Sequence, residues 1–419
     1  MPADAQVAGL ALPLLALTLA GVLARPGGIR EWLVAVTGAL AVLLVGSIAP
    51  ADAVVAIWRQ WDVFLFLLGL MGIASIVEQS GVVEHLAVFA ERHARGRRDL
   101  LLVLVSAVAV LVTATLSNDA TVLILTPLVV SMCLQLRVPV LPYAFACALL
   151  ANTASLLLPV ANPANILVLH DAPLRLGAFV GTLLGPSLLA ISATVGGIAF
   201  VFRTELRGAV AVSARPADAP DAGPVALGLI VIVATYLVAL ANGWPVGIVA
   251  VGGAAALLLL RFARGRLRMR RYLAEIEWPI FPFLAGLLVL VAAAERGGLG
   301  GVVARVVAEA DAAGAAGTVG LGATTALASN AMNNLPLAVV MGSGLRESVD
   351  VTRHAIGAVL VGVDLGPNFT TVGSLATMLW LLILRRREVG ISSIDYVRRA
   401  WLPSALGLAA AIAAVAIAG

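Results

Sequence analysis

Lysine is absent from this chain of 419 residues, so all 27 basic residues are arginine. Without lysine there is no Walker A motif, no Schiff-base nucleophile and no anchor for pyridoxal phosphate. The motifs HExxH, GxSxG, GxGxxG and CxxC are missing too, and no nucleophile with a neighbouring base is visible. We therefore expect a protein that is not an enzyme, with no cofactor and no catalytic residue.

Cysteine is almost as scarce, with only Cys133 and Cys147, and both lie in apolar stretches. Two isolated cysteines make neither a disulfide framework nor a thiol metal site. We accordingly predict no resident metal.

Charged residues are also few: 12% of the residues are charged, whereas 61% are hydrophobic. A soluble domain is about half apolar and a quarter charged. Uncharged runs such as 7–24, 32–51 and 225–242 reach or approach the roughly 20 residues that a helix needs to cross a bilayer. They do not alternate as barrel strands do. The sequence predicts an all-α polytopic membrane protein whose partner is the lipid bilayer.

A net charge of +4 in so apolar a chain indicates basic cytoplasmic loops, not nucleic-acid binding.

The arginines also indicate an orientation. If the loop holding Arg25 and Arg30 is cytoplasmic, 21 of the 27 arginines fall on the cytoplasmic side. Cytoplasmic loops of membrane proteins carry such an excess. This predicts a cytoplasmic loop at 261–271 and both termini outside the cytoplasm.

The two halves of the chain repeat each other. Residues 61–87 align without gaps on 278–304 with nine identities, and 113–125 align on 325–337 at a spacing of 212 residues. In the arginine-derived orientation the two copies run in opposite directions, an arrangement typical of secondary transporters. We predict two inverted repeats, 1–217 and 225–419, joined by a linker at 218–224. Each repeat has about five spans, one re-entrant hairpin (near 100–136 and 315–342) and one interrupted helix (near 138–168 and 353–384).

Polar residues inside the apolar segments gather at the hairpins and at the interrupted helices. Asp119 and Asp364 are acidic residues within such segments, and an ionisable residue at membrane depth is a functional candidate by default. Prolines and glycines at 159, 163, 366 and 367 free backbone groups that are tolerated only in a protein interior or a wet cavity. The polar candidates for solute binding are Ser117, Asn118, Asn152, Thr153, Ser155, Asn162, Asn165, Ser329, Asn330, Asn333, Asn334, Asn368, Thr371, Ser374 and Thr377.

Several of these polar segments resemble the motifs of a known transporter family. The stretch Gly362 to Asn368 followed by Val372 to Trp380 resembles the broken-helix motif of the arsenite and antimonite efflux permeases of the ArsB type, within the ion transporter superfamily. The segments 118–127, 152–165 and 333–336 are similar to other motifs of that family. The serine-asparagine-threonine hairpin motif of sodium-coupled sister families appears here as Ser117-Asn118-Asp119 and Ser329-Asn330-Ala331.

The resemblance implies a transporter of the bacterial inner membrane that exports arsenite, and antimonite with it. Arsenous acid is neutral at neutral pH, and no arginine lies in either polar segment, 152–165 or 364–377, where a dicarboxylate site would use one. Export against a gradient needs a driving ion, and burial favours the neutral form of a carboxyl group. We therefore expect proton entry to be coupled through Asp364 or Asp119.

The alternative is a sodium/proton antiporter or another ion transporter of the same superfamily. A passive channel and an intramembrane enzyme are weaker readings. The sequence leaves open the oligomeric state, the proton stoichiometry, the preference between arsenite and antimonite, and the use of an accessory ATPase.

Overall fold

The computed structural model describes residues 10–24, 29–172, 174–210, 222–348 and 350–418. These residues form helices throughout, and the extended pairing among them is an isolated bridge between Arg97 and Ala209. The elements of the first half are α2 (Ala11–Ala24), α3 (Glu31–Leu44), α4 (Pro50–Arg59), α5 (Trp61–Ser80), α6 (Val82–His93), α7 (Arg98–Thr115), α8 (Asn118–Ala120), η2 (Thr121–Leu125), α9 (Thr126–Leu136), α10 (Leu141–Thr153), η3 (Ala154–Leu157), η4 (Pro159–Ala161), α11 (Pro163–Asp171) and α12 (Leu176–Val201).

The second half repeats this mixture of long helices and short broken ones. Its elements are α13 (Ala222–Asn242), α14 (Val246–Ala263), α15 (Met269–Glu275), α16 (Ile280–Arg296), α17 (Leu299–Ala312), α18 (Gly314–Met332), α19 (Asn334–Glu347), α20 (Arg353–Leu365), η5 (Gly366–Phe369), α21 (Leu375–Arg386) and α22 (Ser393–Ile417). Within the described residues, 8 helical segments are long and apolar enough to cross a membrane. The prediction of an all-α polytopic membrane protein is confirmed.

The helix breaks follow from local chemistry. Leu158 and Asn162 adopt extended backbone, with φ of −138° and −143°, and each precedes a proline, which disfavours helical geometry in the preceding residue. Asn162 then caps α11, because its side-chain oxygen accepts a hydrogen bond from the Ala164 N–H. In the second half, Ser374 caps α21 in the same way by accepting from the Thr377 N–H.

The hairpin turns are built differently from each other. In the first, the chain turns at Ser117, whose hydroxyl accepts from the Ala120 N–H, and a π-helical turn follows over Thr121–Leu125. In the second, Asn333 takes a positive φ of 72° between α18 and α19. Asparagine adopts positive φ more readily than most residues, and its side chain also accepts from the Leu335 N–H.

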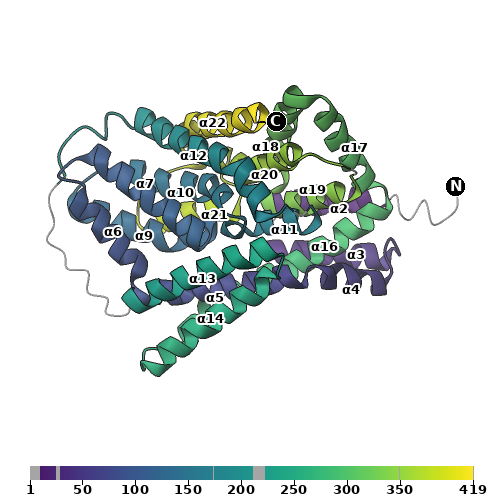
Figure 1. Cartoon of the computed structure of the whole chain (residues 1–419), viewed down its shortest axis with the longest axis horizontal. Helices are drawn as coiled ribbons and strands as arrows, with labels where there is room; N and C mark the ends of the chain where they lie inside the picture. The colour runs from purple at the N-terminus through teal and green to yellow at the C-terminus, as the bar shows by residue number, and fades with distance from the viewer. Residues whose placement is uncertain (1–9, 25–28, 173, 211–221, 349, 419) are drawn as a thin grey trace.

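The long helices pack as two outer groups around the broken ones. On one side α14 packs on α5 and α16 packs on α3, and on the other side α12 and α18 pack on α22. Figure 1 shows α10, α11, α20 and α21 between these groups. Close approach depends on small residues: a Cβ on Gly69 would collide with the backbone of Ala250. The broken helices are thereby enclosed in protein.

Several predicted boundaries need adjustment. Helix α19 continues to Glu347, beyond the predicted end of the hairpin near 342, because Gly342 and Gly344 are buried against neighbouring helices and do not terminate it. Of the predicted linker 218–224, residues 218–221 lie outside the described residues, and 222–224 already form the start of α13. The two interrupted helices run from Leu141 to Asp171 and from Arg353 to Arg386.

Candidate functional site

A carboxylate lies where the two interrupted helices meet. Asp364, near the end of α20, has a side chain that is 0% exposed. Its Oδ1 accepts a hydrogen bond from Asn162 Nδ2 at 2.7 Å, and its Oδ2 accepts from Ser155 Oγ at 2.6 Å and Asn165 Nδ2 at 2.9 Å. All three donors belong to the first interrupted helix, about 200 residues earlier in the chain. The contacts therefore join the halves of the molecule through neutral donors.

A second set of contacts joins the same two interrupted helices, with donors on both sides. Asn152, at the end of α10, donates through Nδ2 to Asn368 Oδ1 at 3.0 Å and to Ser374 Oγ at 3.4 Å. Asn368 Nδ2 in turn donates to Thr153 Oγ1 at 3.1 Å and to the Leu149 carbonyl. The Ser374 and Thr377 hydroxyls lie 3.0 Å apart. We call these residues, together with Asp364 and its three partners, the central network.

Residues that match at a spacing of 212 positions make matching contacts across the two interrupted helices. Asn152 and Asp364 occupy matching positions 212 residues apart, as do Asn162 and Ser374. The bond from Asn162 to Asp364 is thus the counterpart of the bond between Asn152 and Ser374. The matched pair differs in charge, because one member is an amide and the other a carboxylate. The titratable group consequently lies on one side of the arrangement.

Both hairpin turns reach this region. Asn118 Nδ2 lies 3.5 Å from Asn152 Oδ1. Asn330 Nδ2 donates to the Gly366 carbonyl at 2.7 Å, and Asn330 Oδ1 accepts from Thr370 Oγ1 at 2.8 Å. The Asn334 N–H donates to the Gly373 carbonyl, and Asn333 Nδ2 donates to the Val372 carbonyl. The structure therefore places the first turn against the first interrupted helix and the second turn against the second.

Other candidate residues bond locally or not at all. The Ser117 hydroxyl accepts from the Ala120 N–H of its own turn, and Ser329 donates to the Ala326 carbonyl of its own helix while its Oγ packs against Gly366 of the second interrupted helix. Thr371 lies in the loop before α21, partly exposed, and its side chain takes no part in the hydrogen bonds of the described residues. Asp119 is half-buried at the first hairpin turn, where its carboxylate lines a small cavity beside Glu277. The two candidate aspartates thus occupy different surroundings.

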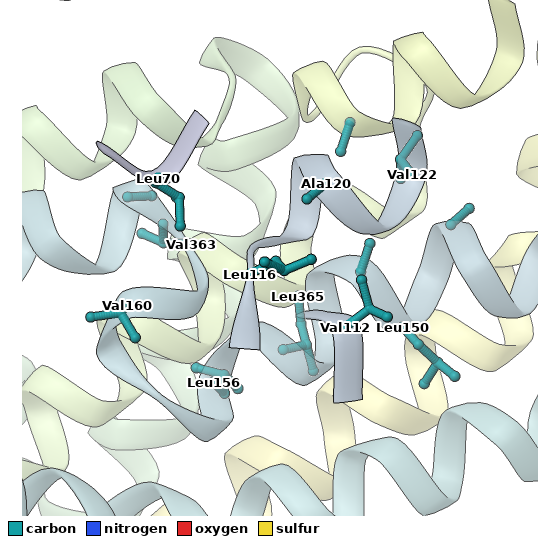
Figure 2. Close-up of a cluster of buried hydrophobic side chains, with 14 of the residues drawn as sticks. Leu70, Val112, Leu116, Ala120, Val122, Leu150, Leu156, Val160, Val363 and Leu365 are labelled. Carbon is teal, nitrogen blue, oxygen red and sulfur yellow. The ribbon is translucent and has the colours of Figure 1, made fainter. Parts of the chain in front are cut away.

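The central network is buried, since Asn152, Asp364 and Asn368 are each at most 1% exposed. Figure 2 shows Leu116 and Ala120 of the first hairpin gathered with Leu156 of η3, Leu365 of α20 and other buried residues. Such burial excludes water, which strengthens the hydrogen bonds and raises the cost of any unpaired charge. A proton gained or lost at Asp364 therefore has a large effect on its neighbours.

Sequence reasoning missed two residues of α22. The Tyr396 hydroxyl donates to the Asn368 carbonyl at 3.1 Å, and Ser404 Oγ lies 3.3 Å from the same oxygen. They are eight residues apart, so both face the same side of the helix. A polar pair at that spacing in an apolar helix is the signal that would have indicated them.

A bundle of membrane-length helices built around broken helices and a buried polar network is the architecture of a membrane transporter. The sequence model of the citrate transporter family, CitMHS, matches residues 15–366. The chain belongs to this family.

Individual relatives of this chain carry more specific names than the family does. The arsenical pump membrane protein of Yersinia enterocolitica is 30% identical over 416 residues, covering 96% of each chain. That of Escherichia coli K12 is 29% identical over 415 residues, again covering 96% of each. An uncharacterized transporter of Mycobacterium tuberculosis is 29% identical over 408 residues, 91% of this chain and 92% of its own. The resemblance to the ArsB-type permeases is confirmed.

A solved structure shares the fold. The YdaH transporter of Alcanivorax borkumensis superposes with a TM-score of 0.56 over 87% of this chain and 86% of its own, at 16% sequence identity. At that identity the likeness concerns the arrangement of helices alone.

Proposed function

We propose that this protein is a secondary active transporter that exports arsenite, and antimonite with it, from the cytoplasm in exchange for protons. The relatives named arsenical pump membrane protein support the substrate. In this proposal the two halves are inverted repeats, both termini face outside the cytoplasm, and the solute is bound by the polar residues of the hairpin turns and interrupted helices.

The observation that carries the coupling is the environment of Asp364. Its two oxygens accept three hydrogen bonds from neutral side chains, and none of the donors is an arginine or a histidine. An ionised carboxylate only accepts hydrogen bonds, whereas a protonated one also donates. Protonation turns one acceptor into a donor, and Ser155 Oγ can accept from it, because the Ser155 hydroxyl can donate instead to the Asn152 carbonyl, also at 2.6 Å. A proton at this position changes how the two interrupted helices hold each other.

The same donors suit the proposed solute. Arsenous acid is a small neutral molecule whose hydroxyl groups donate and accept hydrogen bonds. Asn, Ser and Thr side chains do both, so they match it without a fixed counter-charge. Arginine, which recognises carboxylates by paired hydrogen bonds, takes no part in the hydrogen bonds of the central network among the described residues.

The test is arsenite uptake into everted membrane vesicles, whose interior is acidified by respiration. We expect accumulation that a protonophore abolishes and that vesicles lacking the protein do not show. Accumulation of arsenite that is indifferent to the protonophore would contradict proton coupling. Equilibration without accumulation would indicate a passive channel.

One observation favours the sodium/proton antiporter as a second candidate. Asn165 is 0% exposed, and its Oδ1 has no hydrogen-bond partner among the described residues, although its Nδ2 is bound to Asp364. A carboxylate and an amide oxygen are ligands that hard cations take. Replacing the pH gradient by a sodium gradient in the same vesicles separates the two. Sodium-driven proton movement without arsenite would favour the second candidate.

A further inference from the structure

A small cavity separates the first hairpin turn from the middle of α5. It has a volume of about 60 Å³, and the polar residues of its lining are Ser75, Glu78, Ser117, Asp119, Glu275 and Glu277. A single water needs about 10–15 Å³, so the cavity has room for several waters or one small solute. Two residues of its wall, Ser117 and Asp119, were singled out from the sequence, whereas Glu277 was not.

A second cavity adjoins the second hairpin turn. It has a volume of about 320 Å³ and is lined by Trp32, Glu277, Phe283, Asn333 and Leu335, with Arg30 and Glu31 as its other charged residues. The Trp32 Nε1–H group points to a ligand here, because it is buried and no described residue accepts a hydrogen bond from it. Glu277 is the charged residue common to both walls. It lies on the short link between α15 and α16.

The Glu277 carboxylate makes no hydrogen bond and no ion pair with the described residues. Its neighbour Glu275 contrasts with it, since Glu275 accepts from Ser75, Gln79 and Arg271. A half-buried carboxylate without a protein partner has to be satisfied by water or by a ligand. Packing alone does not require it, so it needs another explanation.

The residue that matches Glu277 in the first repeat is uncharged. Glu277 directly precedes Trp278, and the residue that precedes the matching Trp61 is Gln60. Gln60 is 4% exposed, its Oε1 accepts no hydrogen bond within the described part of the chain, and it lines a separate cavity with Arg59 and Arg346. The same place in each repeat therefore faces a cavity with an unused acceptor. Only the copy between the hairpin turns is charged.

We propose that Glu277 contacts the transported solute and determines its class. In this proposal, which rests on the function proposed above, its carboxylate accepts hydrogen bonds from the hydroxyl groups of a neutral polyhydroxy acid that passes between the two hairpin turns. An ionised carboxylate only accepts hydrogen bonds, so it selects a solute rich in hydroxyl donors. The same charge repels anions, which separates this chain's solute from the tricarboxylate after which its family is called.

The test compares Glu277→Gln with wild type in everted vesicles, using initial rates of arsenite uptake over a range of concentrations. Loss of a charged acceptor is expected to raise the KM about tenfold, while the maximum rate stays within about twofold because no proton-coupling group is altered. Citrate, inactive against wild type, is expected to inhibit the variant. Glu309→Gln, which neutralises an exposed carboxylate on α17, is the matched control and should leave both quantities unchanged.

Glu277→Asp keeps the charge and should keep the KM within about threefold of wild type, which provides a second variant if Glu277→Gln fails to insert. An unchanged KM for Glu277→Gln, in vesicles where wild type accumulates arsenite, overturns the inference and leaves the proposed function standing. A fall in maximum rate at unchanged KM also overturns it. If wild type accumulates no arsenite, the proposed function fails and this inference falls with it.

Discussion

Replacing Asp364 by asparagine tests the coupling most directly. The substitution keeps the shape of the side chain and exchanges one acceptor oxygen for an NH₂ donor. The favourable orientation keeps the oxygen toward Ser155 and Asn165, which together donate two hydrogen bonds. The new NH₂ then faces Asn162 Nδ2, which is also a donor.

The magnitude follows from this single conflict. Asn162 cannot simply rotate its amide, because its Oδ1 accepts from the Ala164 N–H and caps α11. Two buried donors, the new NH₂ and Asn162 Nδ2, are left without an acceptor, which costs about 2–6 kcal/mol together at about 1–3 kcal/mol each. We expect Asp364→Asn to insert and fold with a free energy of unfolding lower by that amount.

Transport should separate into two behaviours. Asp364→Asn should still exchange arsenite across vesicles at equal pH, because the amide and hydroxyl partners remain. It should not accumulate arsenite from a pH gradient, because no proton is exchanged at position 364. Counterflow of labelled arsenite measures the first behaviour, and uptake driven by respiration measures the second.

A charge-swapped variant provides the control. Asn162→Asp combined with Asp364→Asn returns one carboxylate and one amide to the same contact, so it should recover most of the lost stability and part of the pH-driven uptake. Accumulation by Asp364→Asn alone, equal to that of wild type, would refute the reasoning. Asp119 would then become the leading candidate for the proton carrier.

Three further outcomes are expected. Asp119→Asn should retain measurable pH-driven uptake in the same vesicles, since its carboxylate holds no part of the central network; complete loss would move the coupling to the hairpin turn. The double variant Cys133→Ala with Cys147→Ala should keep arsenite resistance in cells, because both thiols are buried and act as small apolar groups; loss of resistance at normal expression would point to thiolate binding. Arg266→Cys in that background should escape labelling by an impermeant maleimide in intact cells, and labelling there would reverse the proposed orientation.

Much of the site could be predicted because its signals are local. Asp364 is conspicuous as a carboxylate in an apolar run, and Pro159, Pro163 and Pro367 mark the breaks around it. Proline restricts its own backbone and that of the preceding residue, so the extended geometry at Leu158 and Asn162 follows from the sequence. Glu277 gave no such signal. It precedes an apolar span, where a carboxylate ordinarily faces the membrane surface.

The sequence by itself determined the spans, the helix breaks and the polar residues placed at them, because hydropathy and proline geometry act over a few neighbouring residues. Only the tertiary structure decided which polar groups meet. Asn152 bonds to Asn368 and Asp364 to Asn162 across about 200 residues of chain, and Glu277 comes to lie between two cavities. These contacts depend on how α5, α16 and the broken helices pack against one another, and helix packing is settled by the fit of whole surfaces, which no local pattern records.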